Sequence, residues 1–366
     1  MSDDDLLIRV LALLAVSLVA IAFAWRARLY NRRLAPATRH PAGNGASRAR
    51  EAPVPAVAPG APFRDPMAES MLRELHRRAF GVARFAHAVP DEHEAMLDTL
   101  RSASLAPFPE PPALLAQLLA TGEGDAALHG LLEALRRDAP LAAAVLELSA
   151  DPAVGHAREH VAGRGPGHAL AALGGAALRA ATASALLRPA FAAAPAAPFA
   201  AFAPAAWRLG QQSALAAAEF ARKAGNCAPV AAHVLGLVHA LGALTVFRVA
   251  LAHYQARPES APRAEVLARL VTERADAAAH ALAVAWNLPA ALRSALAEHS
   301  AQRAPDAMSP LGRALYAGRL LGLAAVLRQH GALDEAGFGE LLARKGLDDA
   351  HGQRPSAGLA ASPVAR

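Results

Sequence analysis

Apolar residues between positions 65 and 330 recur every three to four residues, which is the spacing of helices that bury one face. No stretch alternates apolar and polar residues with a period of two, so we expect no sheet. Prolines and glycines fall at the ends of the periodic runs, where they stop or start helices. The pattern predicts an all-α protein. A first helix starts at Asp65-Pro66, and others cover 112–119, 126–136, 140–148, 175–187, 204–224, 229–254, 262–286, 289–300 and 310–330.

Composition agrees with this prediction. The 366 residues are 54% hydrophobic but only 5% aromatic, and alanine is the commonest residue. Alanine is the best helix former, whereas strands favour β-branched and aromatic side chains. The composition therefore favours helices over strands throughout the chain.

An apolar run of about twenty residues extends from Leu6 to Trp25 and is interrupted only by Arg9. Its length matches the roughly 30 Å hydrocarbon core of a bilayer. A cleaved signal peptide is the alternative, because Ala22-Phe23-Ala24 resembles a cleavage site. Signal peptides begin with basic residues, however, and this chain begins with acidic ones. We therefore expect residues 6–25 to form a transmembrane helix.

The charges beside this run predict its orientation. An acidic tip at residues 1–5 precedes it, and arginines follow it at once. These membrane-flanking residues are Arg26, Arg28, Arg32 and Arg33. Cytoplasmic flanks carry the excess of Lys and Arg, so the part that follows the helix should face the cytoplasm.

The net charge of +6 comes mostly from this flank. Residues 26–50 hold seven arginines and no acid, and the chain from residue 51 onward carries a net charge of about +1. A nearly neutral body with few aromatic residues offers no nucleic-acid surface. We expect no nucleic-acid partner.

Composition shifts divide the rest of the chain. Residues rich in Arg, and then in Pro and Ala, are typical of a disordered linker, and the last residues are similarly polar. The expected parts after the membrane helix are a linker at 26–63, a helical extension at 64–105, a helical domain at 106–345 and a disordered tail at 346–366. The extension could face a partner or associate with a second copy, or it could pack onto the domain that follows.

Residues with special chemistry are scarce. Cys227 is the single cysteine, which excludes an intramolecular disulfide and a four-cysteine zinc site. No Gly-rich phosphate loop and no Gly-x-Ser-x-Gly nucleophile turn is present. These absences leave histidines as the main candidates for a site.

Four segments between residues 110 and 300 form an ordered set. The first two are 131–148, with Asp138-Ala139-Pro140 between two helices, and 169–179, with an Ala-x-x-x-Leu-Gly pattern. The third comprises Trp207, Gln212, Ser213, Gly236, His239, Ala240 and Gly242. The fourth comprises Glu273, His280, Trp286, Pro289 and His299. In this order the segments resemble the HDOD family, non-catalytic relatives of the HD-type metal-dependent phosphohydrolases.

The resemblance implies a helical bundle in which the metal site of the HD enzymes is vestigial. Those enzymes hold a metal with an upstream His, a His-Asp pair and a distant Asp. Here the pair has become His239-Ala240, and Gln212 stands near the expected upstream His. One imidazole would remain, which is too few ligands for a hydrolytic metal. We therefore expect no catalytic residue, no metal, no cofactor and no enzymatic activity.

The remaining histidines have simpler interpretations. A histidine on an apolar helix is ordinarily a packing residue, and we expect this of His239, His280 and His299. We also expect His280 and His299 to hydrogen-bond each other across helices. Trp207 and Trp286 are expected to anchor the core.

The resemblance also implies a role in bacterial signalling through protein contacts. With residues 6–25 in the inner membrane, the chain would be a single-pass protein with a cytoplasmic domain. We expect it to act as a non-enzymatic scaffold for unidentified cytoplasmic signalling proteins. It could also form a homodimer. A nucleotide or small-molecule sensor using the vestigial pocket, and a residual metal-dependent phosphohydrolase, are the alternatives.

Overall fold

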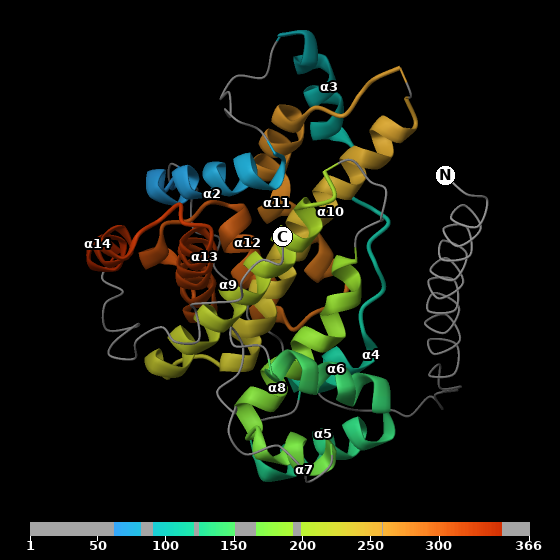
Figure 1. The fold of residues 1–366 in the computed structure, drawn as a ribbon, viewed down its shortest axis with the longest axis vertical. Helices are drawn as coiled ribbons and strands as arrows, with labels where there is room; N and C mark the ends of the chain where they lie inside the picture. The colour runs from blue at the N-terminus through green and yellow to red at the C-terminus, as the bar shows by residue number, and fades with distance from the viewer. Residues whose placement is uncertain are drawn as a thin grey trace, which may run out of the picture. The chain divides into compact units, whose positions relative to one another are not determined.

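A computed structural model describes residues 62–81, 91–120, 124–150, 166–192, 199–257 and 259–345. All regular elements in these ranges are helices, as the sequence predicts (Figure 1). The α-helices are α2 (Pro66–Ala79), α3 (Asp91–Ser102), α4 (Ala113–Ala120), α5 (Asp125–Arg137), α6 (Ala139–Ala150), α7 (Pro166–Ala172), α8 (Gly175–Leu187), α9 (Phe202–Ala224), α10 (Pro229–Gln255), α11 (Ala264–Ala285), α12 (Ala290–Ser300), α13 (Pro310–Gln329) and α14 (Glu335–Lys345). The expected membrane helix at 6–25, its flanking arginines and the tail at 346–366 lie outside the described residues.

Helix α10 is the centre of the core. It packs against α8, α9, α11 and α13, and its apolar residues point in every direction around its axis. Within the described ranges it is the one helix with the length and composition to cross a membrane, but 83% of its most apolar stretch is buried by its neighbours. A helix that is apolar all round is expected at such a position.

Glycines let four of these helices, α9, α10, α11 and α13, approach one another closely. A Cβ atom on Gly236 would lie 2.6 Å from Ala214 Cα on α9, and one on Gly242 would lie 2.6 Å from the Ala279 backbone nitrogen on α11. On α13, a Cβ atom on Gly322 would lie 2.5 Å from the Ser213 backbone nitrogen. No side chain fits in such gaps, so these glycines bring α10 to α9 and α11, and α13 to α9.

Helix α2 packs onto this core. Asp65 accepts hydrogen bonds from the backbone N–H groups of Met67 and Ala68, which is the standard way to begin a helix. The apolar face of α2 is buried within the same chain, next to α13 and α11. This arrangement agrees with the alternative in which the extension packs onto the domain that follows. The same contacts bury the apolar face through which α2 could have paired with a second copy.

The start and the end of the predicted helical region differ in detail from the sequence interpretation. Phe63, placed at the end of the linker, is held in the fold because its N–H donates to Gln302 O at 2.8 Å and its ring meets Tyr316 edge-on. Helix α14 was not predicted, since Gly337 and Gly339 interrupt its apolar pattern. Burial of Phe338 against α13 stabilises α14 despite these glycines.

Candidate functional site

A cavity of about 390 Å³ lies among α2, α9, α10, α11, α12 and α13. Five positions that the sequence analysis singled out line it together, although they come from four different helices. These positions are Ser213, His239, Ala240, Glu273 and His299. The cavity is therefore where the vestigial site of the resemblance would lie.

Four side chains form a continuous hydrogen-bonded row in this cavity. His239 Nε2 lies 2.6 Å from Asp276 Oδ1. The same carboxylate oxygen lies 2.9 Å from Arg319 Nη1, which in turn lies 3.0 Å from His299 Nδ1. His299 Nε2 completes the row by donating to Gly312 O at 2.9 Å. We call His239, Asp276, Arg319 and His299 the cavity row.

The charges in the row are fixed by its geometry. Burial raises the pKa of Asp276, but the positive charge of Arg319 and the hydrogen bond from His239 outweigh burial and hold that pKa well below its usual range. Burial, followed by the charge of Arg319, lowers the pKa of His299 to about 3. The same two causes lower the pKa of His239. At neutral pH the row is an ion pair of Asp276 and Arg319 between two neutral imidazoles.

The tautomers follow from these partners. A neutral His299 that donates from Nε2 has its lone pair on Nδ1, where it accepts from Arg319. An ionised Asp276 only accepts, so His239 must donate from Nε2.

The HDOD domain model matches residues 108–302, which is more than half of the chain. The chain belongs to the HDOD family. Among solved structures, it is similar to a protein from Shewanella amazonensis SB2B provisionally described as a metal-dependent phosphohydrolase, with 16% identity, a TM-score of 0.44, and 80% of this chain and 95% of that chain covered. It is also similar to an HDOD domain protein of unknown function from Geobacter sulfurreducens, with 18% identity, a TM-score of 0.41, and 77% and 95% covered. Both likenesses are distant. No curated protein matches.

Two members of the cavity row were missed by the sequence analysis. Asp276 lies on α11 in an alanine-rich stretch, one turn after Glu273 and one turn before His280, and this helical spacing from two family positions was the available signal. Arg319 lies on α13, outside the residues that the HDOD domain model matches. The prediction that a single imidazole remains at the site was wrong, because His299 joins His239 through Asp276 and Arg319.

The expected bond between His280 and His299 does not form. Both ring nitrogens of His299 are taken, by Gly312 O and by Arg319. Glu273 lines the cavity, but its carboxylate accepts hydrogen bonds from Arg101 of α3 and Arg269 of α11. It ties α3 to the HDOD domain.

The remaining predicted positions lie away from the cavity and make packing or hydrogen-bond contacts. Gln212 is buried, and its Oε1 atom has no hydrogen-bond partner among the described residues. Trp207 packs edge-on against Phe191 at 5.0 Å between ring centroids. Trp286 Nε1 donates to Pro109 O at 2.6 Å, and Pro289 directly precedes α12.

The residues of the cavity do not fit a divalent metal ion. With Arg319 in place between Asp276 and His299, the described part of the chain has no group of three or more His, Cys, Asp or Glu side chains positioned to hold one. Ala240 contributes a methyl group, and the Asp276 carboxylate is already paired with Arg319. His239 directs an N–H group, not a lone pair, at Asp276.

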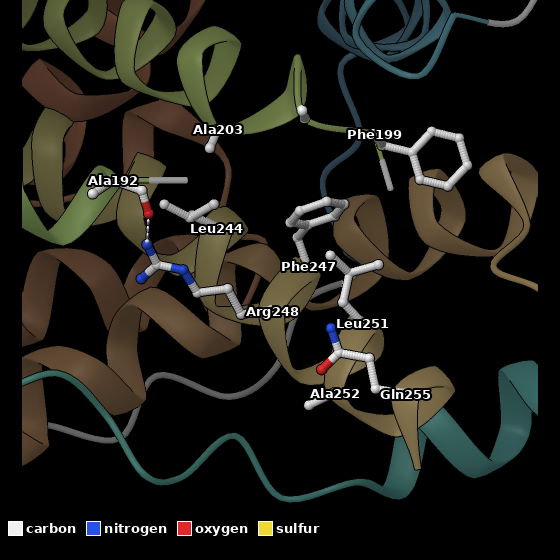
Figure 2. A pocket seen from close by; sticks show the side chains of 10 residues that line it. Ala192, Phe199, Ala203, Leu244, Phe247, Arg248, Leu251, Ala252 and Gln255 are labelled. Atoms are coloured by element: carbon white, nitrogen blue, oxygen red, sulfur yellow. Dashed lines mark hydrogen bonds between the residues drawn. The ribbon is translucent and has the colours of Figure 1, made fainter. Parts of the chain in front are cut away.

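A second cavity, of about 180 Å³, contains none of the predicted site residues. Figure 2 shows its apolar lining, with Leu244, Phe247 and Leu251 of α10. Arg248 extends from the same helix and donates to Ala192 O at 2.8 Å. Its guanidinium serves to fix the chain after the short helix Arg188–Phe191.

Proposed function

We propose that this protein is a non-enzymatic signal-transduction or scaffolding module, held at the bacterial inner membrane by residues 6–25 and acting through protein contacts of its HDOD domain. The observation that carries the proposal is the cavity row. A hydrolytic metal site needs free carboxylates and an open position for water. In the cavity row, the carboxylate of Asp276 is bound to Arg319. The Glu273 carboxylate of the cavity lining is likewise bound to arginines. The adjacent Ala240 supplies no ligand.

The sequence alone supports the membrane attachment in this proposal. The apolar run at 6–25 is followed by Arg26, Arg28, Arg32 and Arg33, whose charges favour the cytoplasmic side. A linker after these arginines would let the domain meet other proteins along the membrane surface.

A small-molecule sensor is the second candidate, and the size of the main cavity favours it. A volume of about 390 Å³ falls within the range of ligand pockets, and its lining combines apolar side chains such as Leu320 with charged ones such as Arg303. Binding there would raise the Tm of the protein, and above the Kd the rise would follow the logarithm of ligand concentration.

The proposal is tested with the full-length chain and a chain lacking residues 1–33, both expressed in bacteria. We expect the full-length chain in the membrane fraction and the shortened chain outside it. Crosslinking in cells, followed by mass spectrometry, should recover the same protein partner in repeat experiments only when the membrane helix is present.

An enzymatic arm accompanies this test. Purified protein is incubated with nucleotide phosphodiesters and phosphomonoesters in the presence of Mn²⁺ or Mg²⁺, beside the variant His239→Ala. We expect no hydrolysis above the metal-only control. Metal-dependent turnover that His239→Ala abolishes would reject the non-enzymatic proposal.

A further inference from the structure

Arg319 occupies the point in the cavity where donor atoms meet. Its Nη1 atom lies 2.9 Å from Asp276 Oδ1 and 3.0 Å from His299 Nδ1. A carboxylate oxygen and imidazole nitrogens are the donors that a divalent transition metal takes in proteins. Here the positive charge beside them belongs to the chain itself.

The charge balance of the cavity row explains why one arginine is enough to neutralise it. Asp276 is the one carboxylate in the row, and the position after His239 is the uncharged Ala240. A single guanidinium therefore neutralises the row, whereas a divalent ion would leave an excess of positive charge in a poorly solvated place. The lone pair of His299 also requires a donor, and Arg319 provides it.

The position of Arg319 depends on close helix packing. Its helix, α13, runs along α9, where a Cβ atom on Gly318 would lie 2.6 Å from Ser213 O. The Ser213 position of the vestigial site lines the same cavity. The glycines of α13 thus bring Arg319 to the row from a segment beyond residues 108–302.

We propose that Arg319 is a built-in cation that completes the cluster of His239, Asp276 and His299, so that the HDOD domain maintains its pocket without a metal and excludes one from it. The inference rests on the proposed non-enzymatic function, which it deepens by naming the group that closes the site. It predicts that removal of Arg319 creates a need for another cation.

The test uses full-length protein purified in detergent with a tag that contains no histidine. Arg319→Ala should have a lower Tm than wild type, and saturating Co²⁺ should raise that Tm by roughly 5–10 °C. Visible absorption of the bound Co²⁺ should report nitrogen and oxygen ligands. Wild-type protein should show neither effect, and adding Asp276→Asn to Arg319→Ala should abolish both.

Arg303→Ala is the matched control. Arg303 lines the same cavity with a similar side-chain exposure, 33% against 30% for Arg319, but its nearest carboxylate, on Glu298, is 4.0 Å away. This variant should gain no Co²⁺ binding. A folded Arg319→Ala protein that ignores Co²⁺, or wild-type protein that binds Co²⁺ through His239, would overturn the inference.

A second variant keeps the test decisive if Arg319→Ala does not fold. Arg319→Gln retains a hydrogen-bond donor on a shorter side chain but has no charge. Its Tm should fall below that of wild type and recover when Asp276→Asn removes the opposing charge. A Tm equal to that of wild type would overturn the inference. All of these readouts are taken on isolated protein, so they can fail independently of the search for partners and of the hydrolysis assay.

Discussion

The hydroxyl of Tyr316 donates a hydrogen bond to Asp65 Oδ2 at 2.6 Å, which joins α13 to the residue that begins α2. The other oxygen of Asp65 caps α2 through the N–H groups of Met67 and Ala68. Burial, and then this hydrogen bond, raise the pKa of Tyr316 above its usual range. One buried carboxylate thus both starts α2 and attaches it to the core.

We expect Asp65→Ala to lower the free energy of unfolding by roughly 2–3 kcal/mol, because it removes a helix cap and a buried hydrogen bond together. Tyr316→Phe removes only the second of these and should cost about 1–2 kcal/mol. Urea unfolding followed by circular dichroism measures both. Equal losses in the two variants would show that the cap contributes nothing.

Gly236→Ala should destabilise the protein by roughly 1–3 kcal/mol, because the new Cβ atom would meet the backbone of α9. Gly130→Ala is the matched control within α5, since a Cβ atom there would have no neighbour within 4 Å. It should stabilise the protein by about 0.5–1 kcal/mol through helix propensity. Thermal unfolding of both variants checks the expected opposite signs, and equal shifts would contradict the close packing of α9 and α10.

His76 predicts how stability depends on pH. Its ring is buried beside Phe80, Phe202 and Thr272, and burial lowers its pKa to about 4. Because an unfolded histidine titrates near pH 6.5, the unfolded chain binds more protons than the folded one between about pH 6.5 and 4. Stability from this residue is therefore complete above pH 6.5 and is lost as the pH falls toward 4.

The variant His76→Gln should reduce the loss of unfolding free energy between pH 6.5 and 4 by up to about 3 kcal/mol. The measurement is urea unfolding of both proteins at pH 7.5, 6, 5 and 4. His233, whose pKa is also lowered to about 4 mainly by burial, should retain its own contribution in the variant. Parallel profiles for wild type and His76→Gln would reject the assignment to His76.

Trp286 and Trp207 give a paired comparison. Trp286→Phe should cost roughly 1–3 kcal/mol, because it leaves the carbonyl of the half-buried Pro109 without its indole donor and opens space around the buried Trp286 site. Trp207 is only partly buried, so Trp207→Phe should cost less than about 1 kcal/mol. Chemical denaturation measures both costs, and a larger loss for Trp207→Phe would contradict the structure.

Local patterns predicted most of the fold, because helix periodicity and the prolines that start or end helices can be recognised within short stretches of sequence. The start of α2 at Asp65-Pro66 and the extent of α10 are examples. The positions Ser213, His239 and His299 came instead from the resemblance to the HDOD family, and they do line one cavity.

The rest of the site depends on contacts between distant residues. Arg319 reaches Asp276 only because glycines let α13 lie against α9, and no periodicity in either helix encodes that distance. Gln212 was expected near a ligand position but is buried away from the cavity lining, since the side of a helix that a residue faces is decided by tertiary packing.

Helix α13 has a consequence for where the chain can be cut. It covers α9 and contacts α10 and α12, yet it begins at Pro310, after the last residue that the HDOD domain model matches. A fragment ended at residue 302 would leave the alanine-rich side of α9 and part of α10 open to water. Such a fragment would expose apolar surface and aggregate. The boundary recognised by sequence comparison is therefore not the boundary at which this protein can be cut and still fold.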